Sequence, residues 1–173
     1  MKKILVLFTC LTVFYTANSQ QGSFDTTFGT NGLTVTPIGN DFCMGHSMVV
    51  LSDGKILMAG QARFGSYKIT LVRYTAEGII DESFGTDGVV TTEIDNSDFA
   101  YSLVVQPDNK ILVGGYSYDG NDYYAIVVRY NEDGSLEQSF GENGISKTGL
   151  ANSETMVLQD DGKIILSVYK TSV

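Results

Sequence analysis

The side chains that most often perform catalysis are scarce in this sequence. It has one histidine, His46, and two cysteines, Cys10 and Cys43. Zinc sites need three or four nitrogen or sulfur ligands, so these residues are too few to form one. When the repeats described below are aligned, Tyr101 and Glu154 take the position of His46, and no acid–base role is common to the three. We therefore expect His46 to be a variable residue at the rim of the fold, and we expect neither a catalytic set nor a cofactor.

Carboxylates are the second candidates for chemistry. Two acidic stretches, residues 95–98 (Asp-Asn-Ser-Asp) and 119–122 (Asp-Gly-Asn-Asp), lie between strand-like runs and offer oxygen ligands for calcium. Neither has the spaced acids of a calcium-binding helix-loop-helix. We interpret both as solvated loops. Loop-bound calcium stays open as an alternative without support from the sequence, and no metal ligand is assigned.

Two arginines and three acids recur at one fixed spacing. Arg73 and Arg129 lie 56 residues apart, each at the end of an apolar run, and Asp25, Asp81 and Glu137 follow the same period. A repeated arginine together with a repeated acid favours a structural ion pair over an anion-binding site. A partly buried charged hydrogen bond of this kind contributes roughly 1.5–3 kcal/mol. We therefore predict that each arginine contacts one of these three carboxylates.

The acids belong to a motif that occurs three times and organises the whole chain. An apolar residue and an acid are followed, after two variable positions, by Phe-Gly, and a second glycine comes three residues later. We name these segments, residues 24–32, 80–88 and 136–144, the Phe-Gly loops. Their glycines suit turns that need a positive φ angle, and each phenylalanine is expected to hold its loop onto the sheets. The motif residues are Phe28, Gly29 and Gly32; Phe84, Gly85 and Gly88; and Phe140, Gly141 and Gly144.

Strand-like runs follow the Phe-Gly loops in a constant order, four in each of the first two repeats. They lie at residues 32–36, 47–51, 55–60 and 67–74, then at 88–92, 102–106, 110–115 and 123–130, and in the third repeat at 155–159 and 163–166. Asp-Gly or Asp-Asn between two apolar runs predicts a tight hairpin. We expect the four runs of a repeat to pair in chain order as one antiparallel sheet.

The runs that begin at Lys55, Lys110 and Lys163 are apolar on both faces, so both faces must be covered. The mature chain has no helical pattern, so other sheets must provide the cover. Four-stranded sheets with short hairpins, stacked on copies of themselves, are the blades of a β-propeller. A β-solenoid is the alternative, although its coils are shorter and lack this series of hairpins. We predict an all-β fold made of propeller blades.

Three segments resemble a known family: residues 80–88 (with Ile-Asp-Glu-Ser-Phe-Gly), 106–115 (Gln-Pro-Asp-Asn-Lys-Ile-Leu-Val-Gly-Gly) and 128–130 (Val-Arg-Tyr). With these motifs the sequence resembles the delta-60 repeat family, bacterial secreted proteins built from tandem units that are predicted to form β-propellers. The resemblance covers nearly all of the mature chain. The resemblance implies the fold and export from the cell. The family has no established catalytic activity that could be carried over to this sequence.

The first 19 residues have the pattern of a secretory signal peptide. Two lysines precede an apolar run at residues 4–15, and small residues at 17–19 form a cleavage site. The run is shorter than the roughly 20 residues of a transmembrane anchor. A lipid anchor on Cys10 is the other alternative, but the apolar run continues past it. We expect cleavage after Ser19 and a secreted or cell-surface protein of residues 20–173.

Composition narrows the partners of this mature chain. Cys43 is its one cysteine, which excludes an intramolecular disulfide, and we expect it to be a small buried apolar residue. The full sequence has 11 basic and 20 acidic residues, a net charge of −9; without the two lysines of the signal, 9 basic residues leave −11. Such an acidic surface disfavours nucleic acid and anionic membranes. We expect no nucleic-acid partner and no membrane insertion after the signal is removed.

The repeats span residues 24–79, 80–135 and 136–173, so two blades of about 56 residues are complete and the third is truncated. Propellers close with roughly four to eight blades. We therefore expect an open, partial propeller that needs further blades or other chains to close, and a fragment of a longer protein. The last run, residues 163–168, should leave an apolar edge, so we expect residues 20–173 alone to self-associate or aggregate.

Two classes of function stay open. The first is a non-catalytic extracellular binding or scaffold module for an unknown protein or glycan, favoured by the aromatic stretch at residues 116–124. The second is part of a secreted glycan-acting hydrolase or lyase whose catalytic residues lie outside this chain. We expect the first.

Overall fold

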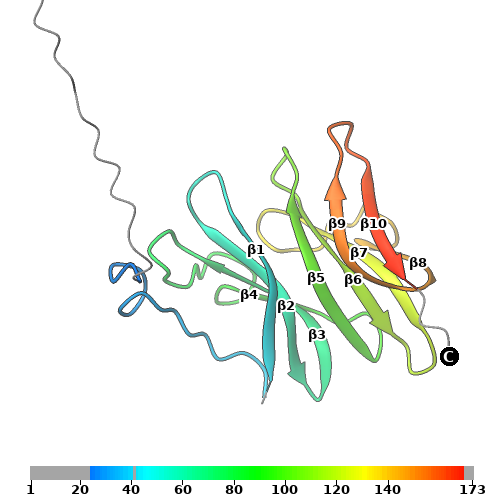
Figure 1. Ribbon diagram of the computed structural model, residues 1–173, viewed down its shortest axis with the longest axis horizontal. Helices are drawn as coiled ribbons and strands as arrows, with labels where there is room; N and C mark the ends of the chain where they lie inside the picture. The colour runs from blue at the N-terminus through cyan, green and yellow to red at the C-terminus, as the bar shows by residue number, and fades with distance from the viewer. Residues whose placement is uncertain (1–23, 41, 170–173) are drawn as a thin grey trace, which may run out of the picture.

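A computed structural model describes residues 24–40 and 42–169, and this part of the chain is all-β, as predicted. It contains ten strands in three antiparallel sheets that follow one another across the molecule (Figure 1). The strands are β1 (Cys43–Val50), β2 (Ile56–Phe64), β3 (Ser66–Tyr74), β4 (Val89–Thr92), β5 (Ser97–Val105), β6 (Ile111–Tyr118), β7 (Tyr123–Tyr130), β8 (Ile145–Leu150), β9 (Asn152–Leu158) and β10 (Ile164–Tyr169). We name the sheet β1–β4 blade 1, the sheet β5–β8 blade 2, and the pair β9–β10 blade 3.

The predicted signal peptide, residues 1–19, and the predicted mature start at Gln20 lie outside the described residues. Within the described part, no helix is long and apolar enough to cross a membrane.

The blades do not coincide with the sequence repeats, and the predicted pairing in chain order is wrong in this respect. The run at residues 88–92 was expected to begin the second sheet, but as β4 it ends blade 1, where Val89 pairs with Val72 and Thr92 with Ile69. Likewise β8 of the third repeat completes blade 2. The Phe-Gly loop causes this offset, because it reverses the chain and returns it beside the strand it has just left.

The first run, residues 32–36, was expected to be a strand of blade 1 and forms only isolated bridges at Leu33. It lies against blade 1 as β4 lies against blade 2. The Tyr74 hydroxyl donates a hydrogen bond to Thr36 at 2.9 Å, and in the next repeat Tyr130 and Thr92 are joined at 2.7 Å. Residues 33–36 therefore occupy the outer-strand position of a blade that would precede blade 1.

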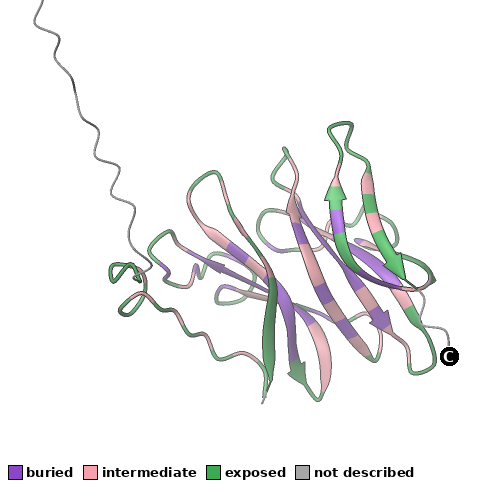
Figure 2. Ribbon diagram, in the orientation of Figure 1, coloured by how far each residue is buried: buried purple, intermediate pink, exposed green. Residues whose placement is uncertain are grey.

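The core lies between the blades. Leu57, Ala59 and Leu71 of blade 1 pack against Val113 and Ile126 of blade 2, all almost completely buried. A second, smaller cluster joins blade 2 to blade 3. Figure 2 shows the buried residues concentrated in β2, β3, β6 and β7, with β10 mostly exposed. The prediction that the central runs are covered on both faces by other sheets is confirmed for β6.

The free face of blade 1 corrects one expectation. Cys43 was expected to be buried, but it is exposed. It lies at the start of β1, the first strand of blade 1, and borders a cavity of about 230 Å³ between residues 34–38 and the outer side of blade 1. No described sheet covers that side, so the burial that a neighbouring blade gives to β5 is absent here.

Candidate functional site

The first strand of every blade is interrupted by a β-bulge at one residue. The register shifts between Gly45 and Ser47 in β1, and at the matching points of β5 and β9, so that His46, Tyr101 and Glu154 are the extra residues. A bulge re-aims the side chain of the extra residue. The three residues that share one position in the repeats are therefore the bulge residues, one in each blade, and the strands that carry them lie side by side because β1 contacts β5 and β5 contacts β9 (Figure 1).

Glycine on the neighbouring strand makes room for the bulges of blades 1 and 2. A Cβ atom on Gly60 would lie 1.9 Å from the carbonyl oxygen of Met44, and a Cβ on Gly115 would lie 1.9 Å from that of Phe99. Both distances are far below van der Waals contact. In blade 3 the matching residue is Val168 on β10, which has no third strand beside it in the described part and can move away from the bulge.

Aromatic rings surround the bulge residues. The rings of His46 and Tyr101 are 4.4 Å apart between centroids, and Tyr101 stacks on Tyr116 at 5.5 Å, with the two hydroxyl oxygens 3.3 Å apart. Tyr123 meets Tyr116 at 5.6 Å and Tyr118 at 4.7 Å. Such tilted and offset pairs are the preferred aromatic arrangements. We name the connected set the aromatic row: Phe42, His46, Tyr67, Phe99, Tyr101, Tyr116, Tyr118 and Tyr123.

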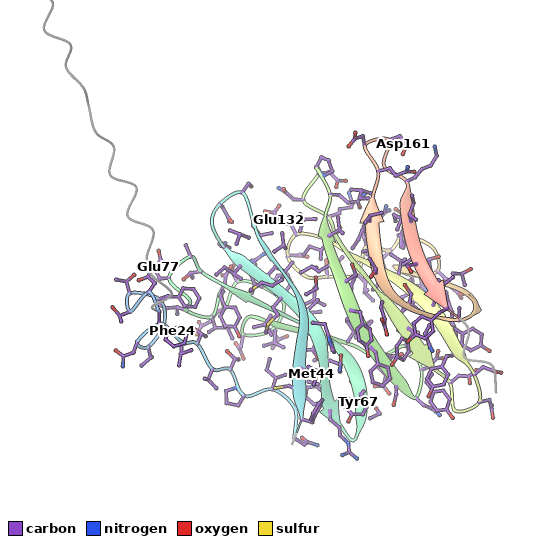
Figure 3. The ribbon with its side chains drawn as sticks, viewed as in Figure 1. Phe24, Met44, Tyr67, Glu77, Glu132 and Asp161 are labelled. Atoms are coloured by element: carbon purple, nitrogen blue, oxygen red, sulfur yellow. The ribbon has the colours of Figure 1, made fainter. Side chains whose placement is uncertain are left out.

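The row lies at one end of the sheets. Figure 3 places Tyr67 at the end of the sheets opposite to Glu132 and Asp161. Asp161 lies in the turn between the first and second strands of blade 3, and Glu132 lies in the turn between β7 and the third Phe-Gly loop. His46 is exposed, Tyr123 is 42% exposed, and Tyr101 and Tyr118 are half-buried. The row therefore leaves parts of its rings exposed to solvent across blades 1 and 2.

Tyr116 in the row and Tyr169 of β10 have raised pKa values. Burial, and then the hydrogen bond with Tyr101, raises the pKa of Tyr116 well above its usual 10. At the blade 3 end, the Tyr169 hydroxyl donates to Glu154 Oε1 at 2.8 Å, and this hydrogen bond raises the pKa of Tyr169. The surface thus combines aromatic rings, hydroxyl groups and a carboxylate. These groups suit the binding of a ligand.

The acidic stretches have protein partners. Asp98 is fully buried, accepts hydrogen bonds from the backbone N–H groups of Ile94 at 2.7 Å and Asp95 at 3.2 Å, and has a pKa raised by burial. Asp95 accepts from Ser117 at 2.5 Å and pairs with Lys147 at 2.6 Å. The lysine ammonium takes the place that a cation would need. Among the described residues, no group of three or more His, Cys, Asp or Glu side chains could hold a metal ion.

The first predicted arginine pair is buried between blades 1 and 2. Arg73 is 6% exposed, its Nε donates to Asp81 at 2.7 Å, and its Nη2 donates to Ser83 at 3.2 Å. Its guanidinium lies 4.5 Å from the centroid of the Phe84 ring. A third donor, Nη1, reaches the backbone carbonyl of Glu132 in the next repeat at 2.7 Å. Arg73 therefore links β3 of blade 1, the second Phe-Gly loop and the turn after β7 of blade 2.

The second pair has the same local geometry without the link to a following blade. Arg129 Nε donates to Glu137 Oε2 at 2.9 Å, and the guanidinium lies 4.5 Å from the Phe140 ring centroid. The third acid, Asp25, accepts hydrogen bonds from the backbone N–H and the hydroxyl group of Thr27, as Asp81 does from Ser83 and Glu137 from Ser139.

The Phe-Gly loops fasten each blade to the next repeat. All six motif glycines have positive φ angles, from 54° to 93°. Gly85 N–H donates to the carbonyl of Asp133 at 2.9 Å, and fully buried Phe84 packs against Gly134 of the same turn. The first loop contacts the turn of blade 1 in the same way. The third loop has no following turn in the described part, and Phe140 is half-buried.

The loop carboxylates make stability depend on acid pH. Hydrogen bonding by Ser83, then by Lys55 and Arg73, holds the pKa of Asp81 far below its usual 3.8, and hydrogen bonding by Ser139 and then Arg129 lowers the pKa of Glu137 from 4.5 to about 2. Because both pKa values are lower in the folded chain, the unfolded chain binds more protons as the pH falls. We expect full stability from these groups above about pH 5 and progressive loss towards about pH 2.

Urea unfolding midpoints at neutral pH and at about pH 3 measure this loss. The Glu137→Gln variant should show a smaller fall than the wild type, because it has no proton to take up at that position. Buried Asp98, with its raised pKa, acts in the opposite direction, since its contribution is lost as the pH rises. Equal wild-type midpoints at the two pH values would contradict the role given to the loop acids.

Stacked four-stranded antiparallel sheets whose first strands lie side by side are the blades of a β-propeller, and the sheets of the described residues form an open, unclosed arrangement of such blades. Residues 51–84 and 106–140 match a domain of unknown function (DUF5122) described as a beta-propeller, a repeat family related to the delta-60 repeats. Each matched segment runs from the turn before the second strand of a blade to the Phe-Gly loop. No curated protein matches the chain.

Sequence reasoning found the arginine pairs and the aromatic stretch at residues 116–124, but not the bulges or the ring contacts that join this stretch to Tyr101 and His46. The bulges depend on strand register and the ring contacts on the packing of strands and blades. Neither can be read from the order of residues in the chain. The available signal was the pairing of small residues, Gly45 with Gly60 and Ala100 with Gly115, beside a polar or aromatic residue in each first strand.

Proposed function

We propose that this protein is a secreted or cell-surface, non-catalytic binding module of the delta-60 repeat type, and that its ligand contacts the aromatic row. The observation that carries the proposal is the alignment of His46 and Tyr101 on consecutive β-bulges, with Tyr116, Tyr118 and Tyr123 stacked beside them. Export is supported by the signal-like pattern of residues 1–19 and by the family resemblance.

The chemistry of the row favours a glycan as the ligand. The faces of tyrosine rings carry negative electrostatic potential and attract the C–H edges of a sugar ring. The hydroxyl of Tyr118 and the carboxylates of Asp119 and Glu154 supply donors and acceptors for sugar hydroxyl groups. A net charge of −9 leaves nucleic acid an unfavourable partner.

Biolayer interferometry against a panel of immobilised neutral and acidic polysaccharides tests the proposal with the chain of residues 20–173. The variant Tyr123→Ala removes an exposed ring of the row, and we expect affinity for the bound polysaccharide to fall about 2- to 13-fold, since one aromatic contact is worth about 0.5–1.5 kcal/mol. The control Phe24→Ala removes a more exposed ring, 68% against 42% for Tyr123, in the first Phe-Gly loop. We expect it to change the affinity less than about twofold.

Two outcomes would count against this function. Equal effects of Tyr123→Ala and Phe24→Ala on the affinity would show that the polysaccharide does not bind at the aromatic row. Release of reducing sugar ends or unsaturated products from a panel polysaccharide would favour the hydrolase or lyase alternative.

A further inference from the structure

The two ends of the blade stack expose apolar faces. On blade 1, Met48 and Val50 point away from blade 2 and are 67% and 66% exposed. On blade 3, Val157 and Ile165 point away from blade 2 and are 50% and 46% exposed, whereas their neighbour Met156 is buried against it. We name these surfaces the leading face and the trailing face.

Each exposed face has a buried counterpart inside the chain. Met48, Leu103 and Met156 hold matching positions on the first strands, opposite the second strand of their own sheets. Leu103 is 8% exposed and packs with blade 1, and Met156 is 4% exposed and packs with blade 2. Met48 is thus the same contact residue without a preceding blade.

The trailing face shows the other half of the same contact. Ile165 matches Leu57 and Leu112, which are fully buried against the following blade. The residue two positions later on each second strand is small: Ala59 in blade 1, Gly114 in blade 2 and Ser167 in blade 3. These small residues make room for the large first-strand residue of the next blade.

Steric fit supports this matching. A Cβ atom on Gly114 would lie 3.1 Å from the Cβ of Met156 and 3.3 Å from its sulfur, so the methionine fills the space over the small residue. At the trailing face, Ser167 is exposed and offers the same kind of position. At the leading face, Met58 and Tyr74 line the cavity of about 230 Å³ beside residues 34–38.

We propose that a second copy of this chain packs its leading face on the trailing face of the first, with Met48 over Ser167 and beside Ile165. The contact continues the interface that already joins blade 1 to blade 2 and blade 2 to blade 3. Because the two faces differ, the contact is heterologous and each copy keeps a free end, so that association continues or closes into a ring. Burial of the exposed methionine and valine side chains drives it.

Two variants that each destroy one face test the proposal. Met48→Asp removes the leading face and leaves the trailing face intact, and Val157→Asp does the reverse. The control Thr91→Asp places the same charge on an exposed strand position of β4, outside both faces. Molar mass is measured by light scattering over a concentration series of residues 20–173, at about 0.15 M salt so that the acidic net charge is screened.

We expect the wild type and Thr91→Asp to exceed the monomer mass increasingly with concentration. Each face variant alone should remain monomeric, with association weakened at least tenfold. An equimolar mixture of the two should form a dimer and nothing larger, because one intact leading face and one intact trailing face remain. The mixture also shows that both variants are folded; if circular dichroism shows either to be unfolded, Met48→Gln and Val157→Gln replace them.

Three results would overturn the proposal. A wild type that stays monomeric at the highest concentration would exclude the contact. Dimers of either face variant alone would show that identical faces pair with each other. A mixture that stays monomeric, although both folded variants have lost the association of the wild type, would show that the leading face does not bind the trailing face.

Discussion

Replacing Arg73 with methionine lowers the free energy of unfolding by about 3 kcal/mol, whereas the same change at Arg129 lowers it by about 1 kcal/mol. Arg73 is almost fully buried and bonds Asp81, Ser83 and the Glu132 carbonyl across the blade boundary. Without it, Asp81 keeps only Lys55 at 3.1 Å as a cationic partner in a site where it is 9% exposed. Removing one partner of a buried ion pair is costly because the other charge stays desolvated.

Arg129 is the matched control for this change. It has the same acid and ring partners, but its side chain is 21% exposed. Urea unfolding followed by circular dichroism, at a concentration where the chain is monomeric, measures both losses. Equal losses at the two positions would contradict the inter-blade role given to Arg73.

Replacing Gly115 with alanine destabilises the protein by about 3 kcal/mol. In a regular strand this change is expected to stabilise by about 0.5–1 kcal/mol, because alanine loses less backbone entropy than glycine. Here the added Cβ would lie 1.9 Å from the carbonyl oxygen of Phe99, which the bulge at Tyr101 directs towards it. Backbone cannot yield as a flexible side chain does, so β5 or β6 must shift.

Gly65→Ala is the control for the added methyl group. Gly65 has a φ angle of +95° and no atom within 4 Å of the added Cβ, so only backbone strain, about 1 kcal/mol, opposes the change. Thermal unfolding of the two variants gives the comparison. An unchanged or higher stability of Gly115→Ala would show that the bulge beside Tyr101 is absent.

The elements of the fold were predictable because their signals are local. Asp-Gly and Asn-containing turns set the hairpins, and positive φ angles at Gly54, Asn109 and Gly162 agree with those turns. Runs in which apolar and polar residues do not alternate required other sheets on both faces, and β6 is covered in this way. The recurrence of Arg73 and Arg129 with an acid also predicted a contact whose geometry the structure supplies.

The assignment of strands to sheets was not predictable from the repeat. A period of 56 residues is unchanged when the blade boundary moves along the chain, so it cannot decide which sheet takes residues 89–92. The predicted burial of Cys43 was wrong for a related reason. Whether this residue is buried depends on a neighbouring blade rather than on the type of residue. The aromatic row joins Phe42 and residues of β1, β3, β5, β6 and β7, which strand pairing within the sheets and packing between the blades bring together.

The central claim is that consecutive blades place their bulge residues side by side to form a ligand surface, and proton NMR tests it most directly. His46 is the one histidine of the chain, so its ring resonances are unambiguous, and the Tyr101→Phe variant identifies the partner ring. With the ring centroids 4.4 Å apart, we predict nuclear Overhauser contacts between the His46 and Tyr101 rings. A His46 ring with contacts only within β1 and β2, in a folded chain, would contradict both the blade packing and the site.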